Sequence, residues 1–134
     1  MSLRVKKPGD RLESITLPPV SRLDLIKYAG ASGDFNPIHT IDEAAEKAGL
    51  PGMIAHGMWT MGNLGKLFTP YVGEGFIEKF SVRFAGMVFP GDHLTLSATL
   101  KEAQGAQQTY EAVAANQDGA KVIKGEIVWR LYGE

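Results

Sequence analysis

The spacing of hydrophobic residues in the second half of the chain constrains the fold more than any other feature. Residues 94–100 and 123–131 alternate between apolar and small or polar side chains. A period of two residues over both runs predicts an antiparallel β-sheet with one covered face. Glycine-containing turn sequences at residues 90–92, 105 and 118–119 divide this half into hairpins. We expect four strands, at residues 76–89, 94–102, 107–116 and 120–132.

The first half of the chain predicts helices, and one of them is unusually apolar. A helix is expected at residues 57–69, where Lys66 is the only charged residue. One apolar stripe of this helix consists of Met58, Met61, Leu64, Leu67 and Phe68. A helix that is apolar on most sides is usually buried. Before it we expect a short strand at residues 11–17, a helix from the N-cap Ser21 to Gly30, and a short helix that ends at Lys47.

The apolar helix at residues 57–69 is the obvious cover for the apolar face of the sheet. A curved antiparallel sheet wrapped around one helix is the hot-dog arrangement, an α+β fold. With 134 residues, the chain suits one domain of this kind. We therefore expect a single hot-dog domain over residues 1–134.

Composition excludes several classes of function. The formal net charge of −1 provides no strong field that would attract nucleic acid or an anionic membrane. The absence of cysteine excludes disulfides, thiolate nucleophiles and cysteine-based zinc sites. No apolar run approaches the roughly 20 residues that span a bilayer, and no signal peptide is evident. We expect a cytoplasmic protein without nucleic-acid or membrane partners, and without a metal or cofactor.

One segment, SGDFNPIH at residues 32–39, concentrates polar chemistry. It holds a carboxylate (Asp34), an amide (Asn36) and an imidazole (His39) within six positions. Pro37 pushes the preceding residue into an extended conformation, so Asp34 and His39 can point into one space. Two groups of different pKa that converge on one water are what reversible hydration requires. Structural roles are the alternative: Asp34 could cap a turn and His39 could pack in the core.

The start of the apolar helix provides a second element. Free N–H groups at a helix N-terminus carry partial positive charge, and a glycine lets a ligand approach closely. Gly57 could therefore stabilise an oxygen that gains negative charge, such as the carbonyl of an enolising thioester. It could equally be only a permissive first residue of the helix. His56 could cap the helix, pack, or touch a ligand.

These residues resemble the signature of the MaoC-like, (R)-specific hydratase/dehydratase family. The segments 55–58, 82–84 and 90–92 fit that family too, so the resemblance extends from roughly residue 8 to the C-terminus. The residues that match the hydratase signature are Tyr28, Ser32, Gly33, Asp34, Asn36, Pro37, Ile38, His39 and Ala45.

The resemblance implies roles for the matching residues. Asp34 and His39 would activate the water that adds to C3 of a trans-2-enoyl thioester and would shuttle the C2 proton. The reverse reaction would dehydrate a (3R)-hydroxyacyl thioester. Asn36 would orient the water or the catalytic pair, and the Gly57 N–H would bind the thioester carbonyl. Ser32 and His56 complete the set of expected substrate-binding residues.

The resemblance also implies partners. The substrate would be an acyl-CoA or an acyl-carrier-protein (ACP) thioester. The chain would form a homodimer, or a heterodimer with a second hot-dog subunit. Two other functions remain open: a non-catalytic, acyl-thioester-binding subunit of a heteromeric dehydratase, and a hot-dog thioesterase, in which a base would attack the carbonyl carbon instead of C3.

Overall fold

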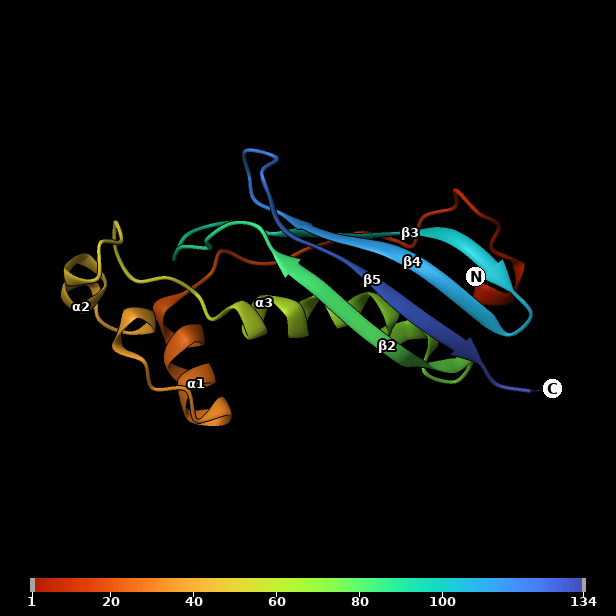
Figure 1. The fold of residues 1–134 in the computed structure, drawn as a ribbon, viewed down its shortest axis with the longest axis horizontal. Helices are drawn as coiled ribbons and strands as arrows, with labels where there is room; N and C mark the ends of the chain where they lie inside the picture. The colour runs from red at the N-terminus through yellow and green to blue at the C-terminus, as the bar shows by residue number, and fades with distance from the viewer. Residues whose placement is uncertain (1, 134) are drawn as a thin grey trace.

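The computed structural model describes residues 2–133, and its main element is one curled antiparallel sheet (Figure 1). The strands are β1 (Ile15–Thr16), β2 (Gly75–Phe84), β3 (Thr95–Gln104), β4 (Gln107–Ala115) and β5 (Lys121–Leu131). Their order across the sheet is β1-β3-β4-β5-β2. Helix α3 (Gly57–Leu64) runs along one face of this sheet (Figure 1). The predicted α+β hot-dog fold is confirmed.

The core lies between the sheet and the segment formed by α3 and the 3-10 helix η3 (Gly65–Tyr71). The apolar members of the repeat at residues 94–100 are all buried, as the period of two predicts. Phe68 of η3 stacks on Trp129 of β5 and meets Tyr110 of β4 edge-on, with ring centroids 5.1 Å apart in both pairs. Burial raises the pKa of the Tyr110 hydroxyl group. No helix within residues 2–133 has the length and apolar character needed to cross a membrane.

The central helix differs from its prediction in two ways. It is α-helical only to Leu64 and continues as the 3-10 helix η3, which contains Pro70. It is also not covered on all sides, since Met58 is 56% exposed. One apolar side of the helix therefore remains accessible in the isolated chain.

Two predicted strands are shorter than expected. The segment before Pro18 pairs with β3 as a ladder only at Ile15–Thr16, with one isolated bridge from Arg11 to Thr99. Strand β2 ends at Phe84 because the N–H groups of residues 85 and 86 both donate to the carbonyl of Val122, which interrupts the ladder.

A small helical lobe lies beyond one end of the sheet, at the left of Figure 1. It contains α1 (Arg22–Ser32), the 3-10 turn η2 (Pro37–His39) and α2 (Asp42–Lys47). The predicted capping box of α1 is present, since Ser21 Oγ accepts from the Asp24 N–H at 3.0 Å and the Asp24 carboxylate accepts from the Ser21 N–H at 3.2 Å. Helix α1 passes the predicted end at Gly30 and stops at Gly33, whose φ of 76° glycine adopts without strain.

Candidate active site

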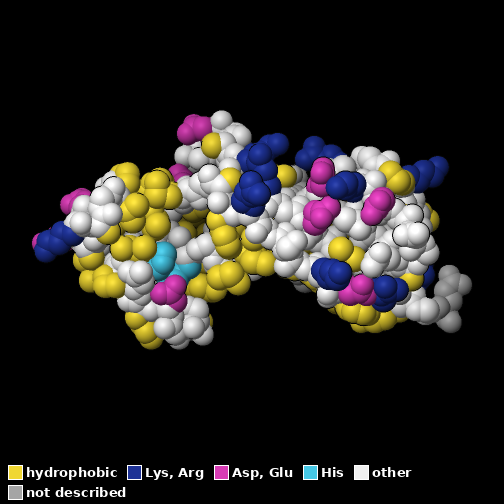
Figure 2. All heavy atoms as spheres, viewed as in Figure 1, with side chains coloured by type: hydrophobic (Ala, Val, Ile, Leu, Met, Phe, Trp, Pro, Cys, Tyr) yellow, Lys and Arg dark blue, Asp and Glu magenta, His cyan; other side chains and the backbone are white. Residues whose placement is uncertain are grey.

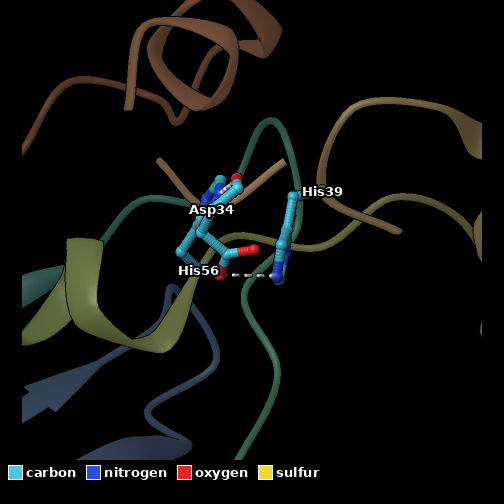
Figure 3. A group of neighbouring side chains, drawn as sticks. All are labelled: Asp34, His39 and His56. Carbon is cyan, nitrogen blue, oxygen red and sulfur yellow. Dashed lines mark hydrogen bonds and ion pairs between the residues drawn. The ribbon is translucent and has the colours of Figure 1, made fainter. Parts of the chain in front are cut away.

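Asp34, His39 and His56 meet where the helical lobe joins the start of α3 (Figure 3). Asp34 follows α1, His39 ends η2, and His56 directly precedes α3. One donor atom from each of the three lies within 4.8 Å of the other two. The structure thus brings together the predicted catalytic pair and one predicted substrate-binding residue.

The hydrogen bonds of His39 define which of its nitrogen atoms is available for chemistry. His39 Nδ1 lies 2.8 Å from the carbonyl oxygen of Ile54, which can only accept, so Nδ1 carries the proton. In the neutral ring, Nε2 then has a free lone pair. Nε2 faces the carboxylate of Asp34, 3.9 Å from Oδ2. The His39 ring is buried whereas the Asp34 carboxylate is half-exposed.

The loop that carries Asp34 is shaped by a series of local hydrogen bonds. Ser32 Oγ accepts from the Asp34 N–H at 3.1 Å, and Asp34 Oδ1 accepts from the Asn36 N–H at 3.1 Å. Asn36 Oδ1 in turn accepts from the Ile38 N–H at 3.2 Å. Asp34 therefore caps a turn with one oxygen and faces His39 with the other. Ser32 and Asn36 form the loop and are not part of the cavity lining described below.

Hydrogen bonds also join η2 and α2 to the segment before α3. The N–H of Ile54 donates to the carbonyl of Ile38 at 3.0 Å, next to the bond between Ile54 and His39. Asp42 Oδ1 accepts from the Met53 N–H at 3.0 Å, and its other oxygen pairs with Arg22 of α1 at 2.7 Å. The Met53 N–H and the Arg22 guanidinium hold the pKa of the Asp42 carboxyl below its usual value. Asp42 thus connects α1, α2 and the segment that orients His39.

His56 is buried against Asp34 and His39 and contacts both residues. Its Nε2–H donates to the backbone carbonyl of Asp34 at 3.1 Å. Its ring stacks on the His39 ring with centroids 3.9 Å apart and planes at 23°, and meets Tyr28 edge-on at 4.9 Å. Nδ1 of His56 is buried and has no hydrogen-bond partner among the described residues. His56 therefore holds Asp34 through a hydrogen bond and His39 through ring stacking.

Asp34, His39 and His56 have the donor types of a metal site, but their arrangement does not favour one. An imidazole nitrogen binds a metal in the plane of its ring, where its lone pair lies. The two histidine rings are stacked in nearly parallel planes, so one ion cannot lie in both. Nδ1 of His39 and Nε2 of His56 already take part in hydrogen bonds. This geometry favours proton transfer.

A largely apolar cavity of about 400 Å³ adjoins His39 and the first turn of α3. In Figure 2 a hollow rimmed by hydrophobic side chains lies beside the exposed edge of the histidines. The Gly57 N–H takes part in none of the backbone hydrogen bonds of residues 2–133 outside the helices and strands. A Cβ atom at Gly57 would lie 2.8 Å from Cε1 of Phe84, so only glycine fits here without displacing that ring. The residues that line the cavity are His39, Ile54, Ala55, Gly57, Met58, Thr60, Phe84, Gly86, Met87, Val88 and Ile123.

Sequence reasoning missed two contributors to the site. The carbonyl of Ile54, which selects the His39 tautomer, is a backbone group and has no sequence signal. Thr60 lines the cavity and is buried, and a threonine on the apolar helix could have been noticed because it is polar in an otherwise apolar first turn.

Comparisons with known proteins agree with this geometry. The family model of the MaoC-like domain matches residues 4–121. The fatty acid synthase subunit beta of Aspergillus oryzae is 39% identical over 131 residues, which is 91% of this chain and 6% of that protein. The chain thus spans only a small part of the curated relatives it matches.

Two solved structures show the same fold at lower sequence identity. The (R)-hydratase from A. caviae involved in PHA biosynthesis superimposes with a TM-score of 0.84 at 22% identity, over 96% of this chain and 99% of that chain. The ChsH1-ChsH2 complex from Mycobacterium tuberculosis gives a TM-score of 0.86 at 17% identity, over 96% of this chain and all of the matched chain (100%).

Proposed function

Because the chain belongs to the MaoC-like dehydratase family, we propose that it is a hydro-lyase that acts on acyl thioesters. The reaction is the reversible hydration of a trans-2-enoyl thioester to a (3R)-hydroxyacyl thioester. The observation that carries the proposal is the free Nε2 of His39, which faces the Asp34 carboxylate beside an apolar cavity. The name of the fatty acid synthase relative supports the proposal, and the (R)-hydratase shares the fold.

The pair can move one proton from water to carbon. Nε2 of His39 accepts a proton from the water while the water oxygen forms its bond to C3, and Asp34 Oδ2 orients that water. The π electrons of the C2–C3 bond move onto the thioester carbonyl, giving an enolate. His39 then returns the proton to C2, the enolate collapses, and neither residue changes its charge overall. Because the same group takes and returns the proton, water adds to one face of the double bond.

The remaining predicted residues support this step in different ways. Gly57 offers its unpaired N–H to the carbonyl oxygen, where the negative charge of the enolate develops. The side-chain oxygens of Ser32 and Asn36 hold the Asp34 loop by accepting hydrogen bonds from backbone N–H groups, and the amide nitrogen of Asn36 remains available to the water. We assign His56 the role of holding Asp34 and His39 in place, instead of the substrate contact expected from the sequence.

A second hot-dog subunit is the expected partner. Strand β2 is an outer strand of the sheet, and an open edge with unpaired N–H and C=O groups can pair with another strand. Three exposed apolar residues lie in this region: Phe76 on β2, Met58 on α3, and Val72 directly after η3. We propose that a copy of this chain, or a second hot-dog subunit, covers them. Analytical ultracentrifugation tests this proposed interface. If a Phe76→Glu variant sediments in the same way as the wild type, the result counts against the interface.

The activity is tested directly with a short trans-2-enoyl-CoA. Loss of the conjugated enone absorbance measures hydration, and release of free thiol measures thioester hydrolysis. We expect hydration without thiol release, and a loss of about 10²–10⁴ in kcat for Asp34→Asn and for His39→Gln. Asp118→Asn and His93→Gln, in exposed segments far along the sequence from the site, are the matched controls. Thiol release alone would indicate a thioesterase, and binding without turnover would indicate a non-catalytic subunit.

A further inference from the structure

Thr60 on α3 has a buried hydroxyl group that nothing within residues 2–133 satisfies. The residue is 1% exposed, and its Oγ1 has no hydrogen-bond partner there. It lines the cavity together with His39 and Gly57. A buried hydroxyl without a partner costs free energy, so such a group calls for a ligand or another explanation. The polar partner that this cavity would receive is the thioester.

Helix geometry indicates which part of the thioester the hydroxyl meets. A helical side chain tilts towards the N-terminus and covers the turn before its own Cα atom. Thr60 stands three residues after Gly57, so its side chain lies over the turn that begins with the free Gly57 N–H. We propose that the Thr60 hydroxyl donates a second hydrogen bond to the carbonyl oxygen that Gly57 binds. This inference rests on the proposed hydration.

Two donors suit the charge that develops on this oxygen. When water adds to C3, the electrons of the double bond move onto the carbonyl oxygen, and they return when C2 takes its proton. A donor within an apolar cavity stabilises this oxygen more strongly than one in water does. Thr60 thus strengthens its hydrogen bond as the reaction proceeds, so its loss affects kcat more than KM.

Valine tests this role because it has the shape of threonine without the hydroxyl. We expect Thr60→Val to lower kcat on the order of 100-fold while Thr60→Ser retains most of it. Removing an unsatisfied buried hydroxyl leaves the protein at least as stable in urea, which separates this effect from a folding defect. Thr99→Val, on the outer face of β3, is the matched control. Difference Raman spectra of a bound saturated acyl-CoA should show a lower carbonyl stretch in the wild type than in Thr60→Val.

The inference is overturned if Thr60→Val keeps the wild-type kcat and carbonyl stretch, or if Thr60→Ser loses as much as Thr60→Val. Failure of the proposed function is a different result. In that case the wild type would hydrate no enoyl thioester, although the carbonyl stretch of a bound acyl-CoA would still report on Thr60.

A second inference rests on a separate observation, a cationic groove on the outer face of the sheet. Arg83 of β2 and Lys124 of β5 are register partners, and Lys121 lies on the same groove. All three are exposed, and none takes part in the ion pairs found among residues 2–133. The other charged residues of this groove are Lys101, Glu111 and Glu126, of which Lys101 and Glu126 form an ion pair at 3.2 Å.

This groove adjoins the cavity. The residues next to Arg83 and Lys124 along their strands, Phe84 and Ile123, line the cavity on the other face of the sheet. Figure 2 shows Lys and Arg side chains gathered beside the hydrophobic hollow. We propose that Arg83, Lys121 and Lys124 bind the phosphate groups of the thioester's carrier arm, which leaves the cavity past this end of the sheet. This inference also rests on the proposed function.

Three substrates with one acyl group separate the possible phosphates: enoyl-CoA, enoyl-phosphopantetheine and phosphate-free enoyl-pantetheine. For the triple variant Arg83→Gln/Lys121→Gln/Lys124→Gln we expect KM for enoyl-CoA to rise about tenfold, since each exposed ion pair is weak. KM for enoyl-pantetheine should not change, nor should any KM in the control Lys7→Gln/Lys66→Gln.

If KM of the triple variant rises for enoyl-phosphopantetheine as well as for enoyl-CoA, the three residues bind the phosphate that CoA and ACP share. If KM rises for enoyl-CoA alone, they bind the nucleotide phosphates. Equal changes for all three substrates, or no change for any, would overturn the inference. Turnover of enoyl-pantetheine by the wild type tests the hydration itself, independently of the groove.

Discussion

Replacement of His56 by phenylalanine gives the sharpest test of how Asp34 and His39, the proposed catalytic pair, are held in place. Phenylalanine keeps the ring that stacks on His39 but removes both nitrogen atoms. Loss of the Nε2–H leaves the Asp34 carbonyl without its donor, which costs about 1–3 kcal/mol. Loss of the unpartnered, buried Nδ1 removes an unfavourable burial of similar size, about 1–3 kcal/mol. Because the two effects oppose each other, the free energy of unfolding should change by no more than about 1 kcal/mol.

Catalysis should respond far more than stability. Without the hydrogen bond from His56, the Asp34 loop can shift, and Oδ2 no longer keeps its distance of 3.9 Å from His39 Nε2. A displacement of about 1 Å at a reacting group costs on the order of 100-fold in rate. We expect His56→Phe to lower kcat by about 10- to 100-fold with little change in KM. Glutamine can place an amide N–H near the position of Nε2, so His56→Gln should recover part of kcat despite losing the stack.

The assay combines enone absorbance for kcat and KM with urea denaturation for stability. The pH profile of kcat/KM is the further readout, because a shifted Asp34 changes the environment in which His39 exchanges its proton. If His56→Phe kept the wild-type kcat while His56→Ala lost it, packing of the ring at position 56 against His39 would be enough to explain the retained activity. The hydrogen bond to Asp34 would then have no part in positioning.

Three further changes probe the site and the lobe that carries it. Gly57→Ala places a Cβ 2.8 Å from the Phe84 ring, so we expect that ring to be displaced and kcat/KM for a short enoyl-CoA to fall roughly tenfold or more. The pKa of the Asp42 carboxyl is lowered in the folded protein, so the ionised carboxylate stabilises the fold at pH values above 3.8, its ordinary pKa. This stabilisation is lost as the pH falls through the lowered pKa. Thermal unfolding should therefore show that the deficit of Asp42→Asn shrinks as the pH falls below 3.8. Gly30→Ala, in an exposed helical position with no atom near a Cβ, should raise the free energy of unfolding in urea by about 0.5–1 kcal/mol.

The sequence was sufficient to predict the sheet and the meeting of Asp34 with His39. Period-two alternation is a local pattern that burial on one face imposes, and residues 94–100 follow it throughout. Asp34 and His39, the two candidate catalytic residues, are close in sequence, so a turn between them was enough to bring them together. Both predictions depended on interactions within a few residues.

What the sequence did not predict depends on contacts between distant segments. The α-helical part of 57–69 ends at Leu64, and the exposure of Met58 depends on which faces the sheet can reach. The contact of His56 with Asp34 joins residues that are 22 positions apart in the sequence. Backbone groups such as the Ile54 carbonyl carry no residue-specific signal, although that carbonyl selects the tautomer of His39.

Asp34 itself allows loop geometry and chemistry to be measured separately. Its Oδ1 accepts from the Asn36 N–H, its Oδ2 faces His39, and its backbone carbonyl accepts from His56. Asparagine keeps one side-chain oxygen for the turn and changes only the group that faces His39, whereas alanine removes both. We therefore expect Asp34→Asn to unfold in urea within about 0.5 kcal/mol of the wild type, and Asp34→Ala to lose about 1 kcal/mol more, the value of a capping hydrogen bond.

Activity should not follow this order. If the carboxylate acts in the reaction, both variants of Asp34 lose hydration to a similar extent in the enone assay, because neither retains a charged group opposite His39. If Asp34 only shaped the loop, Asp34→Asn would remain active and only Asp34→Ala would fail. A difference between the two variants in stability, together with equal loss of kcat, is the pattern that a residue with both roles must produce.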